Sequence, residues 1–205
     1  MFYPIGKFGL QCFFTLCCRI KYIDQNNVPP TGGIIVASNH TSYYDPFAVG
    51  AGIRQKINYM SKQELFQGLQ GWFITRMGAF PVNRDRIDRG ALKTAIEIIK
   101  RGEAVGIFPE GTRSDDGSVG EGQMGAAMLS LQTGAPVVPA AHIGTQGCLV
   151  RKFPPRWKRI MIKYGKPLHP DDFDGNRKEK MRQMTRSIME SIQQLKKELE
   201  EVWVP

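Results

Sequence analysis

Short apolar runs alternate with amphipathic or polar segments along most of this chain, and this alternation constrains the fold more than any other feature. Six of the runs are four to eight residues long, the length of ordinary buried strands. They span residues 34–38, 57–61, 79–82, 104–108, 136–143 and 159–164. Strands that alternate with helices pack in layers, so the pattern predicts an α/β fold with a mixed sheet flanked by helices.

Helical patterns fill intervals between these runs. Asp45 and Pro46 suit the N-cap and the first position of a helix. Two further helices are predicted over 88–100 and 122–132, and a glycine follows each of them. At the C-terminus, apolar residues recur at steps of three and four, which predicts an amphipathic helix. Its apolar face carries Met181, Met184, Ile188, Ile192, Leu195 and Leu199.

Composition excludes several classes of protein. A mean hydropathy of −0.30 excludes a polytopic membrane protein, and no apolar run reaches the length of about 18 residues that a spanning helix needs. Four cysteines are too few for a disulfide scaffold, and no pair has the spacing of a zinc site. We therefore expect four reduced thiols and no bound metal.

Positive charge is concentrated in two blocks. The net charge is +9; residues 54–101 carry ten basic and four acidic side chains, and residues 151–166 carry seven basic and no acidic ones. Such blocks attract polyanions. Charge alone leaves open whether the partner is nucleic acid, an anionic lipid surface or a phosphorylated ligand.

The N-terminal segment indicates a contact with membrane. Residues 8–18 are mostly apolar and rich in aromatic side chains, with Lys7, Arg19 and Lys21 on their flanks. The run is too short to span a bilayer, and no small-x-small cleavage site follows it. An interfacial helix is favoured, and a helix packed on the domain core is the alternative. We predict a membrane-associating helix over 1–22 and a single domain over 23–205.

The first candidate site follows the strand over 34–38. His40 stands where this strand ends, and sites in open α/β sheets gather at the carboxyl ends of strands. If the segment after it is a loop, Asp45 can reach one imidazole nitrogen and leave the other to take a proton. The alternative is a helix-capping Asp with a nearby surface His. His142 and His169 are interpreted as structural or surface residues.

The second candidate site follows the strand over 104–108. The segment Phe108-Pro109-Glu110-Gly111-Thr112-Arg113 combines a glycine, a hydroxyl group and a guanidinium. These groups suit a phosphate monoester, which needs close backbone approach, a hydrogen-bond donor and a bidentate cation. An ordinary polar turn is the alternative.

Taken together, the two segments resemble a known family. N-H-x4-D followed about 70 residues later by F-P-E-G-T-R is similar to the glycerolipid acyltransferases, above all the bacterial 1-acyl-sn-glycerol-3-phosphate acyltransferases. Lys62–Leu65, Gly78–Arg84 and Gly134–Pro139 resemble further blocks of that family, in the same order. Asn83 and Gln123 depart from it, because relatives often carry Asp and Lys there.

The resemblance implies a role for each matched residue. His40 would be the general base for an acceptor hydroxyl, and Asp45 would orient it. The hydroxyl would attack an acyl thioester directly, with no acyl-enzyme. The residues implied in binding the glycerol phosphate are Glu110, Gly111, Thr112, Arg113, Arg84 and Lys62.

The resemblance also implies the reaction and its setting. A fatty acyl group would pass to the sn-2 hydroxyl of 1-acyl-glycerol-3-phosphate (lysophosphatidate) and give phosphatidic acid for phospholipid synthesis. The donor would be acyl-CoA or an acyl carrier protein, with no cofactor and no nucleic-acid partner. We expect a peripheral or monotopic protein on an anionic membrane, at the cytoplasmic face. The alternatives are another acceptor, such as glycerol 3-phosphate or another lysolipid, or a basic membrane-binding module without catalysis. Acyl-chain length and oligomeric state stay open.

Overall fold

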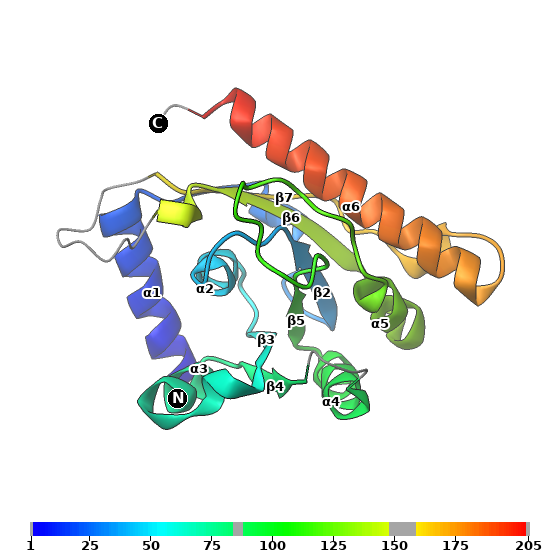
Figure 1. Cartoon of the computed structure of the whole chain (residues 1–205), viewed down its shortest axis with the longest axis horizontal. Coiled ribbons are helices and arrows are strands. Elements are labelled where there is room, and N and C mark those ends of the chain that lie inside the picture. The colour runs from blue at the N-terminus through cyan, green and yellow to red at the C-terminus, as the bar shows by residue number, and fades with distance from the viewer. Residues whose placement is uncertain (1, 84–87, 148–158, 204–205) are drawn as a thin grey trace.

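The computed structural model describes residues 2–83, 88–147 and 159–203. Its centre is a seven-stranded sheet in the order β1-β7-β6-β2-β5-β3-β4 (Figure 1). The predicted mixed sheet between helices is confirmed. The strands are β1 (Lys21–Ile23), β2 (Ile34–Ser38), β3 (Ile57–Lys62), β4 (Phe80–Val82), β5 (Ala104–Ile107), β6 (Val137–Ile143) and β7 (Met161–Tyr164).

Strand direction brings three strand ends to one edge of the sheet. In the run β6-β2-β5-β3-β4, adjacent strands are parallel to one another. β7 is antiparallel to β6, and β1 runs parallel to β7. β2 lies between β6 and β5, so the carboxyl ends of these three strands are adjacent. The chain segments that follow them therefore meet at that edge.

Helices cover both faces of the sheet, because β2 is apolar on both sides. Ile34 and Val36 pack in the cluster formed with α1 and α2, while Ile35 and Ala37 pack in the cluster formed with α4, α5 and α6. Figure 1 shows α6 lying along the sheet, apart from α1 and α2. The helices are α1 (Phe2–Cys18), α2 (Asp45–Ala51), α3 (Gly68–Arg76), α4 (Arg89–Lys100), α5 (Gly125–Thr133) and α6 (Arg177–Glu201).

The predicted C-terminal helix is confirmed as α6. Its N-cap Asn176 and its Glu179 form a reciprocal capping box, which fixes where the helix begins. Its buried residues lie at steps of three and four, as the sequence pattern predicts: Met184, Ile188, Ile192, Leu195 and Leu199.

Helix α1 packs on the core and also exposes apolar side chains. Phe14 and Cys18 are buried in the core, so α1 packs on the sheet domain. On its outer side, Ile5, Phe8 and Leu16 are 69, 68 and 68% exposed. Among the described residues, no helix combines the length and the apolarity that crossing a bilayer requires.

Two local predictions are wrong. Asp45 is the first residue of α2 and not its N-cap; Tyr44 occupies that position and makes no side-chain cap. The expectation of reduced thiols holds for Cys12 and Cys17, which are free, and fails for Cys18, which is disulfide-bonded. Cys148 lies outside the described residues.

Candidate active site

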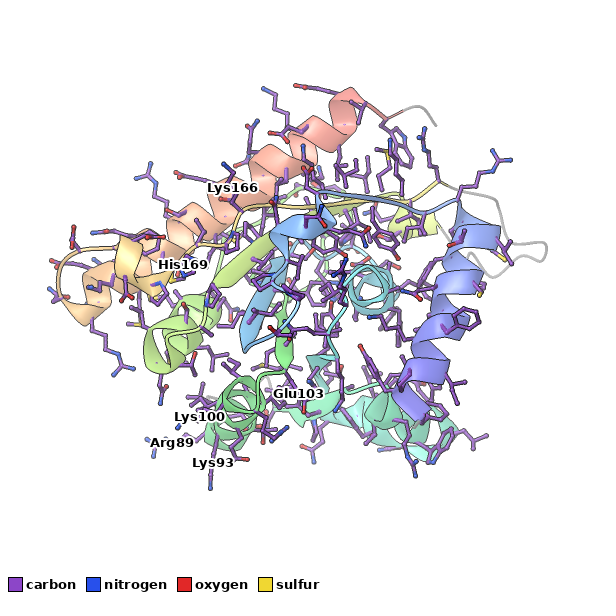
Figure 2. The ribbon with its side chains drawn as sticks, turned by 180° about the vertical axis from the view of Figure 1, so that it is seen from behind. Arg89, Lys93, Lys100, Glu103, Lys166 and His169 are labelled. Atoms are coloured by element: carbon purple, nitrogen blue, oxygen red, sulfur yellow. The ribbon has the colours of Figure 1, made fainter. Side chains whose placement is uncertain are left out.

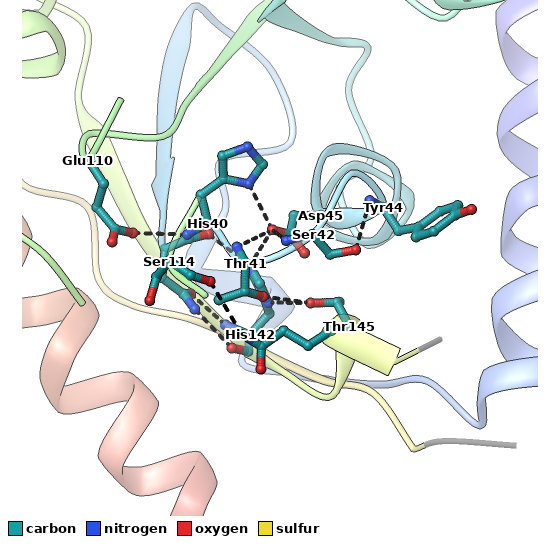
Figure 3. A network of polar contacts seen from close by, with 11 residues as sticks. His40, Thr41, Ser42, Tyr44, Asp45, Glu110, Ser114, His142 and Thr145 are labelled. Atoms are coloured by element: carbon teal, nitrogen blue, oxygen red, sulfur yellow. Dashed lines mark hydrogen bonds and ion pairs between the residues drawn. The ribbon is translucent and has the colours of Figure 1, made fainter. Parts of the chain in front are cut away.

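His40 and Asp45 meet in the loop between β2 and α2. His40 Nδ1 lies 2.8 Å from Asp45 Oδ2. The same oxygen accepts hydrogen bonds from the backbone N–H groups of Thr41 and Ser42, each at 2.7 Å (Figure 3). The carboxylate thus bonds backwards into the loop, where it cannot cap the helix. This closed loop is the geometry that the five-residue spacing requires.

Asp45 is ionised in spite of its burial. Its side chain has no solvent exposure, and burial by itself raises the pKa of a carboxyl group. Attraction to His142 and hydrogen bonds from His142 and His40 oppose this and hold the pKa of Asp45 well below its usual range. An ionised oxygen at 2.8 Å accepts the Nδ1–H of His40, so Nε2 is the nitrogen left to take a proton.

An aromatic stack fixes the plane of the His40 ring. The rings of His40 and Phe108 are stacked, with centroids 4.0 Å apart and planes 15° apart. Tyr59 stacks on Phe108 in turn, at 5.6 Å and 15°. Gly106 makes room for this stack, because a Cβ at that position would overlap the Tyr59 ring. His40 is therefore held through its ring face as well as through Nδ1.

Glu110 ties the two candidate segments together. Its Oε1 accepts the backbone N–H of His40 and its Oε2 accepts that of Gly120, both at 2.9 Å. The backbone N–H of Ser114 donates to the carbonyl oxygen of His40 at 2.8 Å. The segment after β5 thus fixes the backbone on both sides of His40.

A large cavity opens beside His40. Its volume is about 690 Å³, and His40, Lys62 and Arg113 are among its lining residues. The Arg113 guanidinium lies 3.6 Å from the centre of the Tyr43 ring, which also lines the cavity. A cavity of this size accommodates a chain-like apolar group together with a charged one. The apolar part of its lining includes Leu10, Phe47, Leu65, Phe73, Ile74 and Met77.

The predicted site residues differ in where they lie. His40 and Asp45 are in contact, and Lys62 and Arg113 line the cavity. Glu110 bonds to backbone, and Gly111, at a positive φ of 74°, and Thr112 are not among the lining residues. Gln123 packs against Gly111, and a Cβ added at Gly111 would touch the side-chain amide of Gln123. Arg84 lies outside the described residues.

Sequence reasoning missed His142. This residue is 1% exposed and its Nε2 lies 3.4 Å from Asp45 Oδ2, within the same network (Figure 3). Its position near the carboxyl end of a predicted strand was a usable signal, but only the strand order places that strand next to β2. Among residues 2–83, 88–147 and 159–203, no three His, Cys, Asp or Glu side chains are grouped to hold a metal ion.

Fold and site together define an α/β enzyme with its polar groups at the carboxyl edge of the sheet and a large cavity beside them. Residues 19–143 match the family model described as Acyltransferase, and the chain belongs to that family. It is therefore an acyltransferase, which confirms the predicted resemblance and the predicted enzyme class.

Particular relatives agree with this assignment. The chain is 34% identical over 200 residues to the 1-acyl-sn-glycerol-3-phosphate acyltransferase of Bacillus subtilis, covering 95% of this chain and 96% of that protein. It is 37% identical over 146 residues to the chloroplastic 1-acyl-sn-glycerol-3-phosphate acyltransferase BAT2 of Brassica napus, covering 70% of this chain and 39% of that one. The crystal structure of the 1-acyl-sn-glycerophosphate acyltransferase PlsC from Thermotoga maritima is similar to the whole chain, with a TM-score of 0.79 and 28% identity, and 81% of it is covered.

Proposed function

We propose that this protein transfers a fatty acyl group from a thioester to the sn-2 hydroxyl of 1-acyl-glycerol-3-phosphate, giving phosphatidic acid. The relatives carry this activity in their names. The observation that supports it most is the His40–Asp45 pair, because His40 lines a cavity that cationic and apolar side chains also line. Lysophosphatidate needs both kinds of side chain, because it has a phosphate and a hydrocarbon tail.

In the proposed mechanism, His40 acts as general base. Its Nε2 takes the proton of the acceptor hydroxyl while the hydroxyl oxygen attacks the thioester carbonyl carbon. The C–S bond then breaks, the acyl group stays on the acceptor oxygen, and the leaving thiolate takes the proton from His40. A positioned base supplies roughly 10²–10⁴-fold, and holding the two substrates together supplies much of the remainder.

We propose that Arg113 and Lys62 bind the acceptor phosphate, with Arg84 as a further cation that stays a prediction. A guanidinium binds phosphate through two parallel N–H groups, and its stacking on Tyr43 limits its freedom before substrate arrives. Glu110 serves the reaction indirectly, by holding the His40 backbone. Gly111 and Thr112 contribute through the shape of the loop that carries Arg113.

We propose that the protein works at an anionic membrane, as a peripheral or monotopic protein at the cytoplasmic face, with acyl-CoA or an acyl carrier protein as donor. Residues 1–22 would be its membrane-associating part and 23–205 its catalytic domain. The exposed apolar side chains of α1 support this, and so do Leu69 and Trp72 of α3, which are 88 and 51% exposed. Cations on α4, among them Arg89, Lys93 and Lys100, point away from the sheet (Figure 2).

The membrane proposal needs a test that spares the fold. Deleting α1 would also remove Phe14 from the core and Leu10 from the cavity. Phe8→Ser changes only an exposed side chain, and losing its burial in lipid should weaken binding to anionic vesicles about tenfold or more. Val202→Ser is the matched control, because Val202 is an exposed apolar residue outside α1. Equal vesicle binding by both variants would exclude α1 as the anchor.

The acceptor is tested by product analysis. Purified protein, acyl-CoA and vesicles are supplied with lysophosphatidate, glycerol 3-phosphate or a lysolipid without a terminal phosphate, and the products are identified by mass spectrometry. The proposal predicts phosphatidic acid as the main product. A faster reaction with one of the other acceptors would keep the enzyme class and replace the substrate. Vesicle binding without acylation of any acceptor would favour the membrane-binding module.

A further inference from the structure

We infer that His142 is a positioning residue of this active site, which holds the Asp45 carboxylate in the orientation that His40 needs. The inference rests on the proposed function, since it concerns how the proposed base is held. His142 lies near the end of β6, beside the end of β2, because Ser38 pairs with Ala140 in the parallel register of these strands. Two residues after this pair, the chain reaches His40, which lies just beyond β2, and His142, which lies in β6.

The hydrogen bonds of His142 assign the proton on its ring. Nε2 lies 2.7 Å from the carbonyl oxygen of Asn39. A carbonyl oxygen only accepts, so Nε2 carries a hydrogen. Nε2 also lies 3.4 Å from Asp45 Oδ2, an ion-pair distance that is longer than its hydrogen bond to Asn39. His142 therefore approaches the same carboxylate oxygen that His40 contacts.

The other ring nitrogen contacts a hydroxyl group. Nδ1 of His142 lies 3.2 Å from the Thr145 hydroxyl, which lies 3.0 Å from the Thr41 hydroxyl. These contacts help to fix the orientation of the ring, with Nε2 directed at Asn39 and Asp45.

The backbone of His142 is fixed as firmly as its ring. The Asn39 side chain accepts the N–H of His142 at 2.9 Å and donates to its carbonyl oxygen at 3.1 Å. Asn39 directly precedes His40, so one short segment carries both the base and the clamp on His142. A shift of His142 would therefore be transmitted to the base loop.

The distribution of bonds on Asp45 explains why one more donor matters. His40, Thr41, Ser42 and His142 all approach Oδ2. Oδ1 is buried and has no hydrogen-bond partner among the described residues. The orientation of the carboxylate thus depends on the groups around Oδ2, and removing one of them leaves its plane less determined.

The experiment compares His142→Gln with His142→Asn. A Gln amide can reach the position of Nε2 and donate to Asp45, whereas an Asn amide reaches only the position of Nδ1. Both are polar and neutral, so they share the general cost of replacing the ring. We expect kcat to fall about 10–100-fold in His142→Asn, by analogy with the loss when a hydrogen-bond partner of a metal-ligating residue is removed, with KM for both substrates within about threefold. His142→Gln should recover most of the lost kcat.

Control variants distinguish a loss of Asp45 positioning from a loss of stability and from a failure of the proposed function. His169→Asn makes a comparable change at an exposed histidine and should keep full activity. All variants are assayed at a temperature at which circular dichroism shows them folded. Thr145→Val gives a second, milder test, because it removes the hydroxyl on Nδ1 and keeps the shape; we expect a kcat about threefold lower.

Each outcome has one meaning. Equal kcat in His142→Gln and His142→Asn would overturn the positioning role, and so would unchanged kcat in both His142→Asn and Thr145→Val. If neither His142 variant folds, the Thr145→Val result decides. If His40→Ala keeps wild-type activity, the proposed mechanism fails, and this result differs from a failure of the His142 variants alone.

Discussion

The cavity beside His40 has two contrasting walls. The polar wall is formed by His40, which lines the cavity, with Asp45 and His142 buried behind it, and the polar atoms of this network lie 2.7–3.4 Å apart. The apolar wall, made of residues such as Leu10, Phe47 and Phe73, comes from α1, α2 and α3. Strand ends are fixed by the sheet and by packing on both of its faces, while α1 keeps one side exposed.

This contrast suggests a division of labour. The proposed proton transfer needs atoms placed to within a fraction of an ångström, a precision that the sheet edge would supply. A hydrocarbon chain needs apolar volume and tolerates small shifts, and helices supply that volume. The predictions below change one wall at a time, from the largest expected effect to the smallest.

Asp45→Asn should break the polar wall without changing its shape. An amide in place of the carboxylate cannot stabilise the imidazolium and disfavours the proton on Nδ1 of His40. In enzymes that use a His–Asp pair, this change lowers kcat by up to about 10⁴-fold, and we expect a loss of about 10²–10⁴-fold here. Steady-state kinetics should show KM for acyl-CoA within a few-fold of wild type. A kcat within threefold of wild type would mean that Asp45 only shapes the loop.

Phe14→Ala should weaken the apolar wall through α1. Phe14 is 1% exposed and packs α1 on the core, and removing such a ring costs about 3–5 kcal/mol in the free energy of unfolding. Denaturant titration measures this cost. At a temperature at which the variant is folded, we expect kcat for a long-chain donor to stay within a few-fold of wild type. A rate loss as large as that of Asp45→Asn would remove the division between the walls.

Arg113→Ala tests the boundary between the walls. Losing a charged donor to phosphate costs about 1.5–3 kcal/mol, so KM for lysophosphatidate should rise about 10–100-fold. KM for acyl-CoA should not change, and this serves as the internal control. If both KM values rise together, Arg113 acts on the shape of the cavity and not on the acceptor phosphate.

Acid should destabilise the polar wall within a defined range of pH. The pKa of Asp45 in the fold lies below its ordinary value of 3.8, so its ionised form adds stability that is fully present above that value and is lost as the pH falls below it. Between about pH 4 and pH 2, the free energy of unfolding of wild type should fall more steeply than that of Asp45→Asn. Parallel curves would show that Asp45 is not held ionised by its neighbours.

Local patterns predicted most elements and the contact between His40 and Asp45. The strands over 34–38 and 57–61 and the C-terminal helix lie where apolar periodicity places them. Two elements gave weak signals: β1 has three residues, and α3 contains Gly68 and Gly71, which lower helix propensity. His40 and Asp45 could be paired because they are close in sequence.

Residues distant in sequence were harder to place. His142 joins the site only because β6 lies beside β2, and the order of strands in a sheet is not visible in any local pattern. Glu110 was expected to face the substrate, yet both of its oxygens accept backbone N–H groups. A carboxylate in a loop motif can serve either purpose, and the sequence does not distinguish them.

The most direct test of the central claim is thiol release by wild type, His40→Ala and His169→Ala. Each protein is mixed with acyl-CoA and vesicles, with and without lysophosphatidate, and free CoA is followed over time. The account predicts CoA release that requires lysophosphatidate, persists in His169→Ala and falls about 10³-fold or more in His40→Ala. Release by His40→Ala at the wild-type rate would contradict the account, because the proposed base would then be dispensable.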